Sequence, residues 1–461
     1  MSGSTALEKK NFRHAFYLSS AVWSLGNAFA SGIAVLLLLT HWGGLPWGTA
    51  SMHAFIAPIV GNLFRIFSPI LQKMCPNCRS LCVGLYLLQA VCLCAAALIC
   101  WFSRENAAYF VCPFLILWYT SNICENLAYV TLLVWVKSLF HRKSLGRFFA
   151  LRERWRLTGE VCVFFLCGIL INSFREIYFG REFPAEYLWH IYPGFLFCAG
   201  IFSGGSVWFL RKLPNRSAET DAGPDLKETG ERNAEELPAV SSGKERLFCR
   251  FVGKLWSPLK DPVFRWVLLY GILFAFFTQA EQPIRSKFQY TITNRDGLFM
   301  LWVVAGLTFM TRGGQILAAS FAGKWTDRLG TLRVMGLSQI LTAFAYLFYI
   351  AAALMPNILF LYGASAVWIF YVGLNVALPK FLMDHAGPDK VSRPAVYGFL
   401  SGVGGICGAF FGKSIFDRFP GLLDHYILVF TVFLCVRLLL SLPIFTASGI
   451  ARKRQLSEQT E

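Results

Sequence analysis

Long apolar runs follow one another along the whole chain, and they constrain the fold more than any other feature. A helix needs about 20 apolar residues to cross the hydrocarbon core of a bilayer. Soluble core helices could imitate one or two such runs, but not a dozen, so the pattern predicts an all-α integral membrane protein with twelve transmembrane helices. The predicted spans are 15–40, 47–71, 80–102, 108–136, 153–173, 187–210, 263–283, 298–322, 332–354, 357–380, 393–416 and 424–446.

The composition agrees with this assignment. Of the 461 residues, 56% are apolar and only 15% are charged, whereas about 25% of residues are charged in a soluble protein. Soluble enzymes and disordered proteins are therefore excluded. The formal net charge of +17 would suggest polyanionic partners in a soluble protein. In a membrane protein the position of the charges matters more, and we expect no nucleic-acid partner.

The basic residues give the orientation. If both termini lie inside, 31 of the 43 lysines and arginines fall on inner segments and 8 fall on outer segments. Such a bias fixes the orientation by the positive-inside rule. We expect a multi-pass protein of the plasma (inner) membrane with both termini cytoplasmic.

The chain divides in the middle. Residues 213–262 begin with a polar, partly acidic stretch that predicts a flexible cytoplasmic linker. The end of that segment, 248–262, has the pattern of a short amphipathic helix at the membrane interface. The predicted domains are an N-terminal six-helix bundle over 1–212, a C-terminal six-helix bundle over 263–448 and a cytoplasmic tail over 449–461.

Short sequence matches relate the two halves. Phe12-Arg13 opens the first span as Phe264-Arg265 opens the seventh, and Lys137 after span four matches Lys380 after span ten. The matches occur in the same order along both halves, which indicates two six-helix bundles in parallel repeat, a 6+6 pseudo-repeat.

The most specific motif lies between spans eight and nine. It consists of Gly323, three residues, Asp327, Arg328, one residue, Gly330 and then Arg333. The two glycines suit close helix approach and a tight turn, and the arginines suit the cytoplasmic side. This signature loop resembles that of the major facilitator superfamily (MFS), and the 6+6 layout resembles that family along the whole chain.

The match is partial. Leu332 replaces one of the usual basic residues, and the first-half counterpart keeps little beyond Lys73. The resemblance implies a secondary transporter whose two bundles rock about a site near the membrane midplane. It also implies that spans one, four, seven and ten line the cavity.

Span four carries the strongest candidate face. Trp118, Asn122, Glu125 and Tyr129 are spaced by four, three and four residues, so they share one side of a helix, and Asn126 lies beside them. A carboxylate in mid-membrane costs about 2.5–3.5 kcal/mol on insertion scales, so it should face water, a solute or a partner. Glu125 is therefore a candidate proton carrier, or alternatively a structural acid inside the first bundle.

Further candidates come from the other cavity-lining spans. Asn27 and Gln279 are matched amides of spans one and seven, and Trp368 and Asn375 lie on the corresponding face of span ten. Amides and aromatic rings suit a polar solute that bears hydroxyl groups, although amides also hydrogen-bond between helices. Glu281 lies near the outer end of span seven, where it could simply be hydrated.

Two charges inside spans eight and five predict a gate. Arg312 and Glu160 lie at similar depths, and the resembled fold places these spans opposite each other. We hypothesise an ion pair between the halves that forms in one access state and breaks in the other. Alternatively Arg312 binds an anionic solute, and Arg65 competes for Glu160 or extends to the inner surface.

The sequence favours a secondary active transporter that moves a small polar solute, such as a sugar or an organic anion, with proton symport as one option. A second hypothesis is an exporter of amphiphilic compounds. A membrane-embedded lipid-handling enzyme is the least supported alternative. Cys75 and Cys78 form a CxxC without a second ligand pair, so we expect no metal and no cofactor. The expected partners are the lipid bilayer, the solute and protons, with the chain acting as a monomer.

Overall fold

Every regular element in the described part of the chain is a helix. The computed structural model describes residues 6–75, 77–103, 106–139, 145–179, 185–213, 257–295, 300–384, 392–418 and 425–460. The first half contains α1 (Ala6–Phe29), α2 (Gly32–His41), α3 (Trp47–Phe64), the 3-10 turn η1 (Arg65–Phe67), α4 (Ser68–Met74), α5 (Cys78–Phe102), α6 (Ala107–Leu139), α7 (Leu145–Phe179) and α8 (Ala185–Leu210).

The second half begins with the 3-10 turn η6 (Ser257–Lys260). It continues with α11 (Pro262–Arg295), α12 (Met300–Leu329), α13 (Thr331–Ala343), α14 (Ala345–Leu354), α15 (Ile358–Val367), the 3-10 turn η7 (Trp368–Tyr371), α16 (Val372–Asp384), α17 (Ser392–Arg418), α18 (Tyr426–Leu439) and α19 (Ser441–Thr460).

These helices form the twelve predicted crossings, six in each half, so the predicted membrane fold is confirmed. Ten of the described crossings are long and apolar enough to span a membrane by composition alone. The other two are α7 and α12. Both carry charged residues inside the predicted spans, among them Glu160 and Arg312.

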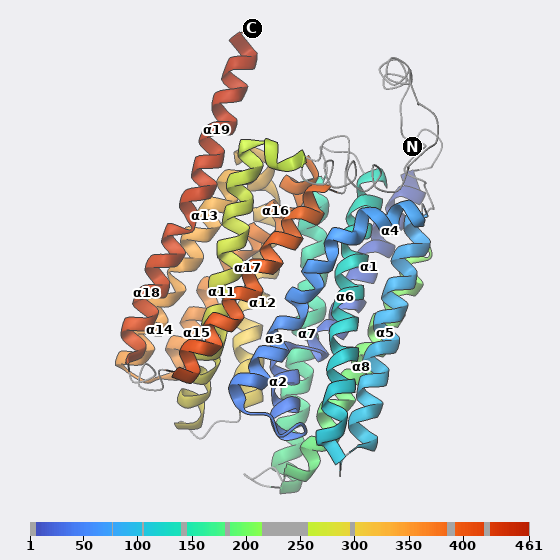
Figure 1. Cartoon of the computed structure of the whole chain (residues 1–461), viewed down its shortest axis with the longest axis vertical. Coiled ribbons are helices and arrows are strands. Elements are labelled where there is room, and N and C mark those ends of the chain that lie inside the picture. The colour runs from blue at the N-terminus through green and yellow to red at the C-terminus, as the bar shows by residue number, and fades with distance from the viewer. Residues whose placement is uncertain are drawn as a thin grey trace, which may run out of the picture.

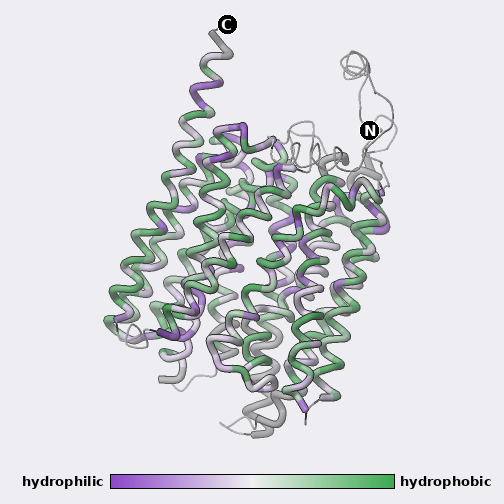
Figure 2. The backbone as a smooth tube through the Cα atoms, in the orientation of Figure 1, coloured by the Kyte–Doolittle hydropathy of each residue, from purple (hydrophilic) through white to green (hydrophobic). Residues whose placement is uncertain are grey.

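The two halves stand side by side as two bundles (Figure 1). The start of α1 and the end of α19 lie at the same end of the molecule, and α19 extends beyond the bundle there. We call this the terminal end and the opposite one the distal end. Figure 2 shows apolar residues along most of the helix lengths, with hydrophilic residues at the ends and between the bundles.

The apolar core is divided between the two halves of the chain. Each bundle contains two buried clusters, built around Trp135 and Phe114 in the first half and around Phe264 and Phe430 in the second. A fifth cluster joins the halves: Ala150 and Leu157 of α7 pack with alanines of α12 and valines of α16. The side chains in this fifth cluster are small, which lets the two bundles approach closely.

Helix α17 has two glycine faces. A Cβ atom added at Gly404, Gly408 or Gly412 would meet backbone atoms of α11, so this stripe packs α17 against α11 within the second half. On another face, Gly402 and Gly405 meet side chains of α3 in the first half. Such close packing suits a membrane protein, because apolar helices in lipid associate mainly through van der Waals contact between small residues.

The elements differ from the predictions in two places. The signature residues Gly323, Asp327 and Arg328 belong to the last turns of α12, and the turn itself occurs at Gly330, whose φ is +87°. The tail predicted over 449–461 continues α19 as a helix as far as Thr460. Most of the predicted linker, and the start of its amphipathic helix, lie outside the described residues.

Gly408→Val tests the packing of α17. The added side chain would overlap the carbonyl of Phe276, and overpacking of this kind costs about 1–3 kcal/mol. We expect a lower thermal unfolding midpoint for the detergent-purified protein. Gly84→Val is the matched control, because nothing lies within 4 Å of a Cβ at that position. Equal midpoints for the two variants would contradict the packing.

Candidate functional site

Two cavities lie between the halves. The distal cavity has a volume of about 580 Å³ and the terminal-side cavity one of about 440 Å³. Both are lined by helices of both bundles, and Glu125, Phe274 and Tyr371 line both of them. These three residues therefore mark the level at which the two spaces meet. Either volume falls within the range of about 300–1,000 Å³ that is usual for small-molecule sites.

Helix α6 lines both cavities with its polar face. Asn122 and Trp118 line the distal cavity, and Asn126 and Tyr129 line the terminal-side cavity. Glu125 lies between these pairs, and its Oε2 accepts a hydrogen bond from Gln89 Nε2 at 3.0 Å. The spacing of the sequence had placed these residues on one face of a helix.

The candidate residues on the other cavity-lining helices are likewise divided between the two cavities. Asn27 and Trp368 line the distal cavity, and Asn375 lines the terminal-side cavity. Backbone irregularities lie beside them: α1 ends at Phe29 and α2 starts at Gly32, while Trp368 begins the 3-10 turn η7. Non-helical backbone at membrane depth is tolerated where it lines a cavity.

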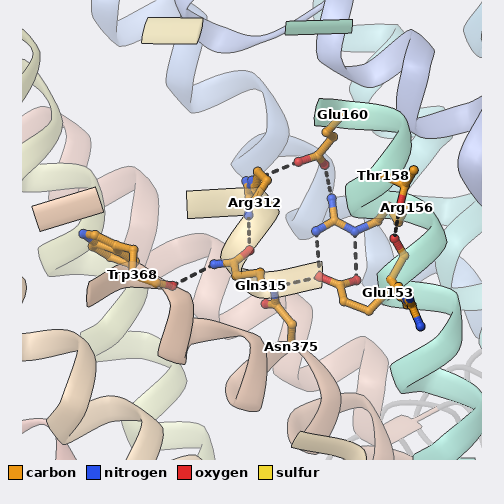
Figure 3. Close-up of polar contacts among 9 residues, drawn as sticks. Glu153, Arg156, Thr158, Glu160, Arg312, Gln315, Trp368 and Asn375 are labelled. Atoms are coloured by element: carbon orange, nitrogen blue, oxygen red, sulfur yellow. Dashed lines mark hydrogen bonds and ion pairs between the residues drawn. The ribbon is translucent and has the colours of Figure 1, made fainter. Parts of the chain in front are cut away.

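A row of charged groups joins the halves, and we call it the interface cluster: Glu153, Arg156 and Glu160 of α7 with Arg312 of α12 (Figure 3). Arg156 donates to Glu153 at 2.7 and 2.8 Å and also to Glu160. Glu160 Oε2 in turn lies 2.9 Å from Arg312 Nε. The cluster holds two positive and two negative charges and is neutral as a whole.

Neighbouring amides extend the interface cluster into the second half. Asn375 of α16 donates to Glu153 at 2.9 Å, which is a second polar contact between the bundles. Gln315 accepts from Arg312 at 3.0 Å and donates to the carbonyl oxygen of Trp368 at 2.8 Å. The interface cluster thus connects α7 to three segments of the second bundle (Figure 3).

Sequence reasoning missed a second charged group, the C-half cluster. Glu281 of α11 accepts hydrogen bonds from Arg285 at 3.0 Å, from Arg437 of α18 at 3.1 Å and from Tyr346. Glu281 is only 1% exposed, so the expectation that it could be hydrated is wrong. The signal was present in the sequence, since Arg437 and Glu281 are both charges inside apolar spans and each needs a partner.

Two candidate residues do not do what the sequence suggested. Gln279 is absent from the lining of both cavities, and Thr278 and Gln282 on the same helix line the distal cavity instead. Arg65 does not compete for Glu160: it donates to Asn126 Oδ1 at 3.0 and 2.6 Å and lies over the ring of Tyr129. Both errors concern the direction in which a side chain points from its helix. That direction depends on the rotation of the helix about its axis, which the apolar pattern alone does not determine.

The signature residues lie apart from the cavities, at the terminal end. Asp327 forms an ion pair with Lys380 of α16, while Arg328 and Arg333 are exposed. The Asp327–Lys380 pair joins the end of α12 to α16 within the second bundle. Gly330, whose positive φ favours glycine, allows α13 to start directly after α12.

Arg156→Met tests the interface cluster. The substitution removes the partner shared by Glu153 and Glu160, and breaking a buried pair costs about 3–5 kcal/mol. We expect a clearly lower unfolding midpoint. Arg154→Met on the same helix is the control, because Arg154 is exposed and its replacement should have little effect. If both variants unfold alike, the cluster does not stabilise the protein.

The comparisons with known proteins concern the fold. No protein-family model and no curated protein matches the sequence. The structure is similar to that of the MFS proton:xylose symporter XylE (13% identity, TM-score 0.63, 96% of both chains). It is also similar to the human organic anion transporter MFSD10 (14%, 0.58, 95% of this chain and 99% of that one) and to the nucleoside transporter NupG (12%, 0.54, 95% and 98%). The chain therefore has the fold of the major facilitator superfamily, as the signature predicted.

Proposed function

We propose that this protein is a secondary transporter that carries a small polar solute by alternating access. The observation that carries the proposal is the distal cavity, which lies between two bundles and is lined by polar groups of both. A solute held there would contact both halves, so rocking of the halves would expose it to one side of the membrane and then to the other.

The contacts between the halves suit reversible opening. They include the neutral interface cluster, the small apolar side chains of α7, α12 and α16, and the glycine face of α17 on α3. Short polar contacts and small side chains can separate without exposing a large apolar surface. We infer that the Glu160–Arg312 pair forms in one access state and breaks in the other.

The lining favours a polar solute over an amphiphilic one. The charged residues Glu125, Glu160, Arg285 and Arg312 all line the distal cavity. An exporter of amphiphilic compounds would need a more apolar lining for its substrate. The positive-inside rule places the terminal end, and with it both termini, in the cytoplasm, and the plasma membrane is the location that we propose.

Solute counterflow tests the proposed function. Purified protein in proteoliposomes loaded with unlabelled sugars, organic anions or nucleosides should accumulate the matching labelled solute for at least one class. Liposomes without protein provide the control for leakage. The proposal fails if no solute exchanges although the protein is folded and correctly inserted.

The gate is tested by a double-mutant cycle of Glu160→Gln and Arg312→Gln. Each single substitution removes the ion pair between the halves, so the two effects should not add. We expect a coupling free energy of about 0.5–3 kcal/mol in unfolding stability and altered exchange rates in both single variants. Additive effects on stability and exchange would show that the two residues act independently.

Glu125→Gln tests proton coupling. The carboxyl of Glu125 lies where the cavities meet, so it can exchange a proton with either side. If it carries the coupling proton, the amide variant should still exchange solute in counterflow but no longer respond to an imposed pH gradient. A gradient response equal to that of the unmodified protein would remove this role from Glu125.

A further inference from the structure

The C-half cluster carries more positive than negative charge. Arg285 and Arg437 share a single carboxylate, that of Glu281, and both approach the same atom, Oε1, at 3.0 and 3.1 Å. The other oxygen of Glu281 accepts from Tyr346. Within the described part of the chain no second carboxylate contacts either arginine, so one positive charge of this cluster is left uncompensated.

The surplus charge faces the distal cavity. Arg285 lines that cavity and its side chain is 18% exposed, whereas the side chain of Arg437 is 3% exposed and lies behind it. Both guanidinium groups also lie over the ring of Trp368, at 5.8 and 5.9 Å from its centroid. Ring contacts stabilise a cation only modestly, and a charge at membrane depth still requires an anionic partner.

The other charges of the region do not supply that partner. The interface cluster is neutral in itself, because Arg156 and Arg312 balance Glu153 and Glu160. Glu125, on the opposite wall, interacts electrostatically with Arg65 and Arg156, while Arg285 interacts with Glu281 and Arg437. The surplus at Arg285 is therefore available to a bound anion.

The wall formed by the first half has a different chemistry. Gln89 and Trp118 line the distal cavity and are only 4% and 3% exposed. Gln89 Oε1 and Trp118 Nε1 have no hydrogen-bond partner among the described residues. A buried polar atom without a partner costs about 1–3 kcal/mol, so this acceptor and this donor suit the hydroxyl groups of a solute.

From these two walls we infer that the solute is a hydroxylated monocarboxylate, such as a sugar acid. Its carboxylate would pair with Arg285, and its hydroxyl groups would bind Gln89 and Trp118. The single surplus charge favours a monoanion over a phosphate ester, which carries a charge closer to −2. The inference rests on the proposed function, because it names the substrate class of the same cavity.

Binding to the purified full-length protein tests the inference. The probes are D-glucuronate, D-gluconate and D-glycerate, compared with D-glucose, which is neutral, acetate, which has no hydroxyl groups, and D-glucose 6-phosphate. At least one of the three hydroxylated monocarboxylates should bind about tenfold or more tightly than the other probes, by calorimetry and by the unfolding midpoint. If none of the three binds, or if glucose or the phosphate ester binds as tightly, the inference is wrong.

Four variants, one of them a matched control, locate the binding charge. Arg285→Gln removes the facing cation, and Arg437→Met removes the surplus without altering the cavity lining, so both should weaken carboxylate binding about tenfold or more. Lys287→Gln on the same helix is the matched control, because Lys287 lies over Tyr290 and outside both cavities, and it should bind normally. Arg285→Lys, which keeps the charge, should retain the preference for carboxylates if Arg285→Gln unfolds. Equal affinities in Arg285→Gln and Lys287→Gln would overturn the assignment.

Counterflow separates this inference from the proposed function. If a neutral solute exchanges across the proteoliposome membrane and no monocarboxylate binds, transport stands and the anion site is wrong. If a monocarboxylate binds in an Arg285-dependent manner but no probe exchanges, the site stands and transport is wrong.

Discussion

The structure depends on how charges are kept inside a bilayer. Each ionised side chain at membrane depth must find a partner, because leaving it alone in hydrocarbon is costly. The protein meets this requirement with two clusters of charged side chains. The interface cluster is neutral and bridges the bundles through Glu160 and Arg312. The C-half cluster lies within one bundle and retains a positive surplus beside the cavity.

The two clusters suit different roles in the transport cycle that we propose. A neutral pair between the halves can separate when the halves rock, provided that each charge keeps another partner, and Arg156 provides one for Glu160. In that proposed cycle a surplus charge within one bundle would keep its neighbours, so it would hold an anion in both access states. The gate and the binding site thus require different charge balances.

Much of the fold could be predicted from the sequence. Apolar length gave the twelve crossings, and the spacing of Trp118, Asn122 and Glu125 gave the cavity face of α6, because helical periodicity is a local property. Among contacts between distant helices, the Glu160–Arg312 pair was expected and is present, but others were not foreseen. Arg65 and Gln279 were misplaced because their neighbours depend on helix rotation. Glu281 was misjudged because its partner, Arg437, lies 156 residues away in sequence.

The central claim is that the two bundles rock about a solute held between them. Double electron–electron resonance tests it with spin-labelled noncanonical amino acids at Ser80 and Arg328 for the terminal end, and at Phe102 and Met355 for the distal end, all exposed positions. The account predicts that on addition of solute one distance shortens while the other lengthens. Two distances that stay fixed with and without solute, in a protein that binds it, would contradict the account.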